Sequence, residues 1–488
     1  KVVREIGQKI ITFLSQIENF QKKLFEKKKF VVDTNYCVTL DRAPKELYST
    51  ILENEQQLNY WEECYGMDQW EKNLEWNGEW TEAVLKNHPS MMIDTKFFGE
   101  DFKYKLLSSP NFHNLDDNVG GLIFNSENFQ TLSLLLEKYK QKIDVTYIDP
   151  PYNTASSEIL YKNNYKHSSW LSLINDRLFL NDILISPKGF FNITIDYAEL
   201  FNLGKLTDQR FGKNNRVGIL SIYINPKGRQ HERFFSSSVE YMLVYAKDVN
   251  KSSFNDVTID KEKSKEFKHT DSKGNYRLDE FARIRTSTKR EKKPNFWYPI
   301  YVSPDLKEVT HKQKSDYYEI YPVNKSGEEY TWKLIKESFI NRNKDGLYVA
   351  KKNKDGRIII YNKYYETQVF KNIWTNKKYF PEFRGTNLLK NILGQNLFSY
   401  PKSIHAVFDT LKIMSKKESI VLDYFAGSGT TGHAVLNLNR EDDSNRKYIQ
   451  IEMGQYFNTV LKPRLQKVVF SNNWKDGVPQ DKDGQSHA

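Results

Sequence analysis

The tetrapeptide Asp149-Pro150-Pro151-Tyr152 constrains this chain more than any other feature of its sequence. It follows the apolar run 143–148, which predicts a buried strand, so we expect Asp149 at the carboxyl end of a strand. In open α/β sheets, ligands bind at that edge. The two prolines fix φ and remove two backbone donors, which leaves carbonyl groups pointing outward without partners. A carboxylate, a free carbonyl and an aromatic ring this close together suit an exocyclic amine on a flat base; the alternative is a rigid surface turn.

Strands and helices alternate around this tetrapeptide and again near the end of the chain. Strands are predicted at 122–124, 143–148, 189–195, 420–424 and 447–452. Helices are predicted between them at 129–139, 170–185 and 432–438. This βαβ rhythm is typical of a mostly parallel sheet that is covered on both faces, so we predict an α/β fold.

A second motif lies between the strand 420–424 and the helix that follows it. Asp423, Phe425, Gly427 and Gly429 form the pattern D-x-F-x-G-x-G. Glycines in such a turn let a ligand approach the backbone, and the helix N-terminus faces that ligand. The pattern differs from the dinucleotide pattern G-x-G-x-x-G, which argues against NAD. Glu452 ends the next strand, where an acidic side chain commonly accepts hydrogen bonds from ribose hydroxyls; the alternative is a solvated strand end.

With 488 residues the chain is long enough for two or three domains. Residues 1–115 are predicted to form a mostly helical region without a catalytic constellation, and 217–397 an α+β insert. The insert separates the α/β halves 116–216 and 398–470, and a polar tail, 471–488, is expected to be loosely ordered. Lys1 is not a methionine, so we expect the chain to come from a longer product.

The charge of the chain indicates an anionic partner. Its formal net charge is +11, which favours nucleic acid. Basic and aromatic residues interleave in the insert, and Arg283, Arg285 and Arg290 are the candidate DNA contacts; the alternative is a solvated charged loop. The two cysteines, Cys37 and Cys64, exclude a disulfide framework and lack metal-ligand spacing, so no metal site is expected. They fit the reducing cytoplasm, and no apolar run approaches a membrane-spanning length.

D-P-P-Y and F-x-G-x-G on two strands of one sheet resemble the S-adenosylmethionine-dependent amino methyltransferases of DNA, which have a Rossmann-like sheet. The order of the motifs, with a target-recognition insert between them, is the β-class arrangement. Further segments resemble the Mod subunits of type III restriction–modification systems. These segments are 125–129, 167–171, 225–229, 398–403 and 473–477.

The resemblance implies roles for individual residues. Phe425, Gly427 and Gly429 would hold the methionine part of S-adenosylmethionine, with Asp423 near its amino group and Glu452 on its ribose. The remaining cofactor and DNA positions implied in this way are Lys402 and Ser403 at the cofactor's carboxylate, Asn125 near its adenine, and Lys227 and Arg229 on DNA. It also implies double-stranded DNA as substrate, a homodimer and a helicase–nuclease restriction subunit as partner.

The chemistry predicted for this combination is methylation of N6 of a flipped-out adenine. Asp149 and the carbonyl of Pro150 would accept the two amine hydrogens, and Tyr152 would stack on the base. N4-cytosine methylation is the first alternative, and Asp149 favours adenine because cytosine enzymes more often have Ser there. Methylation of RNA or of a protein amide is less compatible with the large basic insert. A chain acting chiefly as the DNA-recognition subunit of a restriction complex is a further alternative, against which the intact motifs argue.

Overall fold

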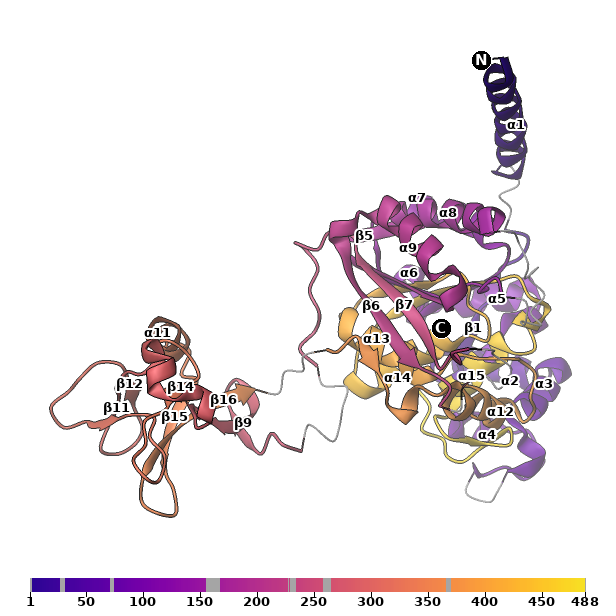
Figure 1. The fold of residues 1–488 in the computed structure, drawn as a ribbon. Helices are drawn as coiled ribbons and strands as arrows, with labels where there is room; N and C mark the ends of the chain where they lie inside the picture. The colour runs from indigo at the N-terminus through magenta and orange to yellow at the C-terminus, as the bar shows by residue number, and fades with distance from the viewer. Residues whose placement is uncertain are drawn as a thin grey trace. The chain divides into compact units, whose positions relative to one another are not determined.

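The computed structural model describes residues 2–26, 31–70, 74–154, 167–226, 228, 234–257, 265–365 and 370–487 (Figure 1). The chain forms two compact units, and each has its own core. The first consists of residues 1–255 and 371–488, and the second of residues 256–370.

The first unit is built on an eight-stranded sheet with the order β17-β6-β7-β5-β4-β18-β19-β3. Its strands are β3 (Gly121–Asn125), β4 (Ile143–Ile148), β5 (Ile185–Ile195), β6 (Arg216–Tyr223), β7 (Val239–Ala246), β17 (Ile373–Trp374), β18 (Ile420–Asp423) and β19 (Lys447–Glu452). All neighbours pair in parallel except β7, which is antiparallel to both β5 and β6. The central strands are almost entirely buried, as a sheet covered on both faces requires. The predicted α/β fold is therefore confirmed.

Two groups of helices pack on this sheet. One group contains α7 (Asn128–Tyr139), α8 (His167–Leu184) and α9 (Tyr197–Phe211), and the other contains α13 (Ile404–Met414), α14 (Thr430–Asp442) and α15 (Leu461–Phe470). Through α7 and α8 the chain steps along the sheet in one direction, and through α14 it steps in the other. Because crossovers between parallel strands are right-handed, these two directions place the groups on opposite faces.

The change of direction occurs between β4 and β18, which lie side by side in the sheet. The chain leaves β4 toward β5 and leaves β18 toward β19, so the loops after the two strands diverge. Such a switch point opens a crevice at the carboxyl edge of the sheet. Both sequence motifs follow these two strands, so the topology brings D-P-P-Y and F-x-G-x-G to the same crevice.

The region before β3 is mostly helical. Its helices are α1 (Val2–Glu26), α2 (Tyr48–Leu52), α3 (Glu55–Tyr65), α4 (Glu82–Asn87), α5 (Glu100–Leu107) and α6 (Leu115–Asn118), and a small antiparallel pair joins β1 (Cys37–Thr39) to β2 (Met92–Asp94). Asn54 caps α3 by accepting the Gln57 N–H at 3.0 Å, and the helix ends at Gly66 with a φ of +62°. Fully buried Trp61 donates its indole N–H to the carbonyl of Met92 at 2.7 Å, which fastens α3 to β2. Neither cysteine forms a disulfide.

The end of the chain is ordered against the first unit, so the expectation of a loosely ordered tail is wrong. The short strands β20 (Trp474–Lys475) and β21 (Val478–Pro479) form an antiparallel pair beside α12 (Asn387–Leu393). The backbone N–H of Gly477 donates to Asn391 at 2.7 Å, and the carbonyl of His487 accepts from Thr39 at 3.1 Å. Polar side chains hold the tail as well, since Asp481 accepts hydrogen bonds from Ser471 and Asn473, and a polar composition does not show that such side chains have partners.

The second unit, residues 256–370, lies inside the predicted insert 217–397 and is shorter, because β6, β7 and β17 belong to the large sheet. It contains a four-stranded sheet of β8 (His269–Asp271), β9 (Gly274–Glu280), β15 (Tyr348–Lys352) and β16 (Ile358–Tyr365). A three-stranded sheet consists of β11 (Ile300–Val302), β12 (Val309–Thr310) and β13 (Tyr318–Ile320), and β10 (Ala282–Arg283) pairs with β14 (Thr331–Trp332). Together with α11 (Lys336–Asn343) they enclose an aromatic core that includes Phe281, Trp332, Phe339 and Tyr348.

No helix in the part of the chain that the structure describes combines the length and apolar character needed to cross a membrane.

Candidate active site

A cavity of about 700 Å³ lies in the crevice between β4 and β18. This volume falls within the range of roughly 300–1,000 Å³ that is typical of small-molecule sites. Its wall combines residues 149–152 after β4, Asp423 at the end of β18 with residues 425–428 after it, Glu452 at the end of β19 and residues 398–402 before α13. The two motifs thus line one continuous space.

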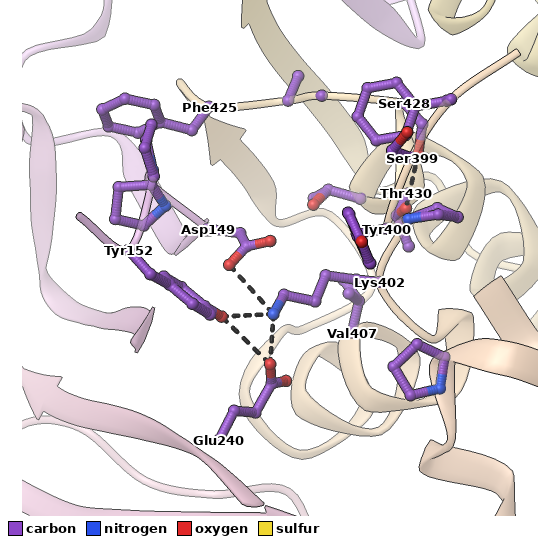
Figure 2. Close-up of a pocket in the computed structure, with 18 of the residues that line it drawn as sticks. Asp149, Tyr152, Glu240, Ser399, Tyr400, Lys402, Val407, Phe425, Ser428 and Thr430 are labelled. Carbon is purple, nitrogen blue, oxygen red and sulfur yellow. Dashed lines mark hydrogen bonds and ion pairs between the residues drawn. The ribbon is translucent and has the colours of Figure 1, made fainter. Parts of the chain in front are cut away.

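The carboxylate of Asp149 is held through one oxygen and is open at the other. Its Oδ1 accepts the hydroxyl of Thr194 at 2.6 Å and lies 3.2 Å from the Lys402 ammonium nitrogen. Among the described residues, no donor reaches Oδ2, and Figure 2 draws a contact with Lys402 from only one of the two Asp149 oxygens. The carbonyl of Pro151 accepts the indole N–H of Trp170 at 2.8 Å, whereas that of Pro150 has no such donor in the described chain. The cavity therefore offers two free acceptors, Asp149 Oδ2 and the carbonyl of Pro150.

Tyr152 lies beside this carboxylate and is held at its hydroxyl. The hydroxyl donates to Glu240 Oε2 at 3.1 Å and also contacts the ammonium of Lys402. The Lys402 nitrogen lies 4.7 Å from the centroid of the Tyr152 ring. Burial raises the pKa of Tyr152 well above its usual value, and the neighbouring carboxylates add to that shift. The phenol is therefore neutral, and the contacts at its hydroxyl fix its orientation.

Lys402 and Glu240 form a buried ion pair at the base of the cavity (Figure 2). Only 13% of the Lys402 side chain and 4% of the Glu240 side chain are exposed. Burial raises the pKa of Glu240, while the charge of Lys402 opposes that shift. Burial alone lowers the pKa of Lys402, but the negative charges of Asp149 and Glu240 outweigh it and leave the pKa above its ordinary value. Lys402 therefore stays charged.

Asp423 anchors the glycine-rich turn at the opposite end of the cavity. Its carboxylate accepts the N–H of Phe425 at 3.0 Å and the hydroxyl of Thr431 at 2.6 Å. Burial raises the pKa of Asp423 to about 7 despite these hydrogen bonds. Gly427 has a φ of +53°, and a side chain there would begin 3.4 Å from the ring of Phe398. The glycine therefore keeps the turn open toward the cavity.

Glu452 fastens the end of β19 to the same turn. Its Oε2 accepts the N–H of Gly427 at 2.8 Å, and its Oε1 accepts those of Met453 at 2.9 Å and Gly454 at 2.8 Å. A carboxylate has about four acceptor positions, so roughly one remains free on Oε2. Glu452 can shape the turn and still accept a hydrogen bond from a ligand.

A fully buried arginine supports the turn from α15. Arg464 donates to the hydroxyl of Ser428 at 2.8 Å and to that of Thr430 at 2.9 Å. Burial lowers the pKa of Arg464 to about 9. Ser428 and Thr430 line the cavity, whereas Arg464 itself does not. Its role is to hold the start of α14 in place.

The structure brings most of the predicted site residues together and separates others from the cavity. Asp149, the two prolines and Tyr152 line the cavity with Asp423, Phe425, Gly427, Glu452 and Lys402. Gly429, with a φ of +82°, caps α14 just outside the lining. Ser403 is buried and donates to the carbonyl of Lys378 at 2.7 Å, and Asn125 is exposed at the end of β3; neither lines the cavity.

The candidate DNA contacts lie elsewhere. Arg283, Arg285 and Arg290 are exposed on the second unit. Lys227 and Arg229 fall outside the described residues.

Glu240 and Tyr147 line the cavity but are not among the predicted site residues, and Thr194, which contacts Asp149, was not predicted either. Glu240 is the second residue of β7, Thr194 lies near the end of β5, and Tyr147 lies within β4. The Tyr147 hydroxyl has no hydrogen-bond partner in the described chain, although only 2% of the residue is exposed. The available signal for Thr194 was its position near the end of the predicted strand 189–195, whereas Glu240 lies within the predicted insert 217–397.

An α/β sheet with a cavity of this size at its switch point and a D-P-P-Y beside it defines a protein of the Rossmann-like class. The family model described as "DNA methylase", N6_N4_Mtase, matches residues 143–462. The chain belongs to this DNA methylase family, and the predicted resemblance is confirmed at that level.

Curated relatives agree with this assignment. The chain is 32% identical over 402 residues to the "Type III restriction-modification enzyme EcoPI Mod subunit" of Escherichia phage P1, covering 72% of this chain and 61% of the relative. It is 30% identical over 346 residues to the "Type II methyltransferase M.KpnI" of Klebsiella pneumoniae, covering 69% of this chain and 81% of that protein. The StyLTI Mod subunit of Salmonella typhimurium is 28% identical over 384 residues, and the match covers 71% of this chain and 54% of that subunit. The chain thus spans about three fifths of the EcoPI Mod subunit's length.

Proposed function

We propose that this chain is a site-specific DNA methyltransferase that transfers a methyl group from S-adenosylmethionine to N6 of a flipped-out adenine. The observation that carries the proposal is the single cavity shared by the open Asp149 carboxylate and the glycine-rich turn of Gly427. One end of the cavity offers hydrogen-bond acceptors and the ring of Tyr152 to a base with an exocyclic amine. The other end offers a site for a nucleoside cofactor.

The residues present fit S-adenosylmethionine. The buried Asp423 carboxylate suits a cationic amino group, and the free position on Glu452 Oε2 suits a ribose hydroxyl. Phe425 adds apolar surface, and Gly427 allows close approach to the backbone. When bound, the cofactor supplies a methyl group activated by a sulfonium centre.

Two residues assigned to the cofactor by resemblance are less well placed. Ser403 and Asn125 do not line the cavity, so a contact with the cofactor would require a change in conformation. Gly429 acts through the turn that it shapes at the start of α14.

At the other end the protein's own groups bind and orient the target amine. Asp149 Oδ2 accepts one N–H of the amine and the carbonyl of Pro150 accepts the other. This arrangement pushes the nitrogen toward tetrahedral geometry and directs its lone pair into the cavity. Tyr152, held at its hydroxyl by Glu240, stacks on the flipped base and excludes water from one of its faces.

DNA recognition is assigned to the second unit, residues 256–370. Arg283 and Arg285 are exposed, and no ion pair holds either guanidinium within the described residues. Free cations of this kind suit phosphate contacts, which fix register on the duplex. Lys227 and Arg229 are further DNA contacts that we propose from the resemblance alone.

We also propose partners and a location, which the similarity to Mod subunits supports. A Mod subunit of a type III system implies a homodimer and a helicase–nuclease restriction subunit. DNA modification places the chain in the cytoplasm, where Cys37 and Cys64 remain thiols.

The variant Asp149→Ala tests the proposed function. We expect it to bind S-adenosylmethionine as the wild type does and to lose methyl transfer by about a hundredfold or more, because one amine acceptor is missing. Transfer of labelled methyl groups to unmethylated genomic DNA measures activity, and long-read mapping then distinguishes N6-adenine from N4-cytosine. Asp182→Ala is the matched control. It removes a carboxylate on α8 that forms an ion pair with Lys247. Undiminished methylation by Asp149→Ala would refute the mechanism.

A further inference from the structure

Glu240 reaches the active site because β7 runs against its neighbours. The parallel strands β4 and β18 bring their carboxyl ends to the cavity, whereas antiparallel β7 brings its beginning there. Glu240 is the second residue of β7, and its side chain enters the cavity wall beside Tyr152. A carboxylate that is only 4% exposed at this point is costly unless it has charged partners.

Its partners form a closed set around one ammonium group. Figure 2 shows Lys402 extending between Asp149, Tyr152 and Glu240, with its nitrogen in contact with all three. A lysine ammonium has three N–H donors, and these three acceptors can use all of them. Tyr152 in turn donates its hydroxyl hydrogen to Glu240 at 3.1 Å.

The same count explains the orientation of Asp149. A carboxylate oxygen accepts about two hydrogen bonds, and Oδ1 has Thr194 at 2.6 Å and Lys402 at 3.2 Å. Oδ1 is therefore filled, and Oδ2 is left for an incoming donor. Rotation of the carboxylate would break both contacts, so the open oxygen keeps its direction.

We propose that Glu240 and Lys402 are a positioning pair, which fixes Asp149 and Tyr152 so that the open Asp149 oxygen and the tyrosine ring receive the target base. This role rests on the proposed function. It differs from the contact with the cofactor's carboxylate that the resemblance implies for Lys402. Glu240 acts through Lys402, and Lys402 acts through Asp149 and Tyr152.

Removal of either charge should disturb this arrangement in a specific way. With Glu240→Gln, the buried ammonium keeps Asp149 as its single charged partner and competes more strongly for that carboxylate. With Lys402→Met, Asp149 loses one of the two groups that orient Oδ1. Displacement by about 1 Å can cost about a hundredfold in rate, so we expect each variant to lower kcat by about ten- to a hundredfold.

The groups that face Glu240 are Lys402 from the segment before α13, Asp149 and Tyr152 from the loop after β4, and Tyr147 from β4. Because burial raises the pKa of Glu240, we expect its protonation to contribute to a loss of activity as the pH falls. Glu240→Gln imitates the protonated form at every pH. The activity of Glu240→Gln should therefore fall less steeply than that of the wild type as the pH is lowered, because no Glu240 carboxylate is left to be protonated.

The experiment compares Glu240→Gln, Lys402→Met and the double variant in the full chain. We expect both single variants to lower kcat and to keep the Kd for S-adenosylmethionine within about twofold, and the double variant to be no worse than the poorer single one, since groups acting as a unit are not additive. An NMR titration of the lysine ammonium groups should show a lower pKa for Lys402 in Glu240→Gln, because a negative neighbour has gone.

Asp409→Asn is the matched control. Asp409 is also buried and has the same two kinds of partner, with Lys378 at 2.6 Å and the Tyr379 hydroxyl at 2.8 Å, but it lies outside the cavity lining. We expect it to lower stability and leave kcat unchanged. A Lys402→Met protein with unchanged kcat and a tenfold weaker Kd for the cofactor would overturn the positioning role in favour of a cofactor contact.

The outcomes separate this inference from the proposed function. A wild-type protein that transfers no methyl group contradicts the proposed function. The NMR titration of Lys402 then still tests whether Glu240 and Lys402 interact as a pair. An unchanged Lys402 pKa in Glu240→Gln would overturn the proposed pair. An active wild type with an equally active Glu240→Gln variant overturns the positioning role and leaves the proposed function intact.

Discussion

Asp423 is the buried carboxyl group whose protonation should control cofactor binding. Burial raises its pKa to about 7, so near neutral pH it is partly protonated in the free protein. A bound amino group carries positive charge and favours the ionised carboxylate. We therefore expect the Kd for S-adenosylmethionine to fall between pH 6 and about 7.5, below the ordinary pKa of an amino group. Calorimetry over this range measures the effect.

Asp423→Asn is the control for this pH dependence, and its Kd should change little over the same range. The shift has a second consequence in the free protein. The folded state binds more protons than the unfolded state between the unfolded pKa and about 7, so the free energy of unfolding decreases as the pH rises through that window. A wild-type Kd that is flat between pH 6 and 7.5 would show that no cation lies at Asp423.

Single residues differ in how far the sequence could predict their place. Asp149, Asp423 and Glu452 each end or follow a parallel strand, so the rule for sheet edges brings them together without coordinates. Glu240 escapes that rule because it lies near the beginning of an antiparallel strand. The partners of Lys402 were also out of reach, because a long flexible side chain can turn toward either end of the cavity.

At the scale of elements, Gly432 sets the distance between α14 and β19. A side chain at this position would begin 2.4 Å from Gln450 Oε1 and 2.9 Å from Leu465 Cδ2. Gln450 is fully buried and Leu465 is 4% exposed, so neither side chain can turn out to solvent to make room. We expect Gly432→Ala to lower the free energy of unfolding by about 1–3 kcal/mol through overpacking, as measured by urea denaturation.

Gly7→Ala in α1 is the comparison, because a side chain there would meet no atom within 4 Å. It should be neutral or stabilise by about 0.5–1 kcal/mol, since alanine favours helix. Equal stability of Gly432→Ala and wild type would mean that α14 can move away from the sheet at no cost.

The helices and strands of the α/β halves were predictable from the sequence. Some of the pairings between strands were not. Strands β4 and β19 have the predicted bounds because their buried apolar runs are short and clearly delimited. Strand β7 lies within the predicted insert 217–397, and nothing in its own pattern shows that it pairs with β5 rather than with the rest of the insert. Pairing of distant segments depends on the packed fold and not on local pattern.

At the scale of the whole molecule, the two compact units have different proposed functions, which are methyl transfer and DNA recognition. The first contains the complete cavity, and the second has an independent aromatic core and the arginines proposed for DNA. The sequence predicted a basic insert between the two motifs. It did not show where that insert leaves the large sheet, because β6, β7 and β17 have the same strand-like composition as the second unit.

The arginines of the second unit differ in how free they are to bind phosphate. Arg290 donates to both oxygens of Glu329, at 3.0 and 2.9 Å, and its guanidinium lies 4.8 Å from the centroid of Trp297. Arg283 and Arg285 are exposed, and neither has an ion pair within the described residues. A cation that is already neutralised gains less from a phosphate than a free one does.

We therefore expect the double variant Arg283→Ala/Arg285→Ala to weaken DNA binding and to reduce the slope of log K against log salt by about two, roughly one for each phosphate that an arginine no longer neutralises. Arg290→Ala should change the slope by less than one, because it also frees the charge of Glu329. Fluorescence anisotropy with duplex DNA at several salt concentrations measures both slopes. An unchanged slope in the double variant would place the DNA-binding surface elsewhere, whereas a reduced slope in Arg290→Ala alone would show that DNA displaces Glu329 from its partner.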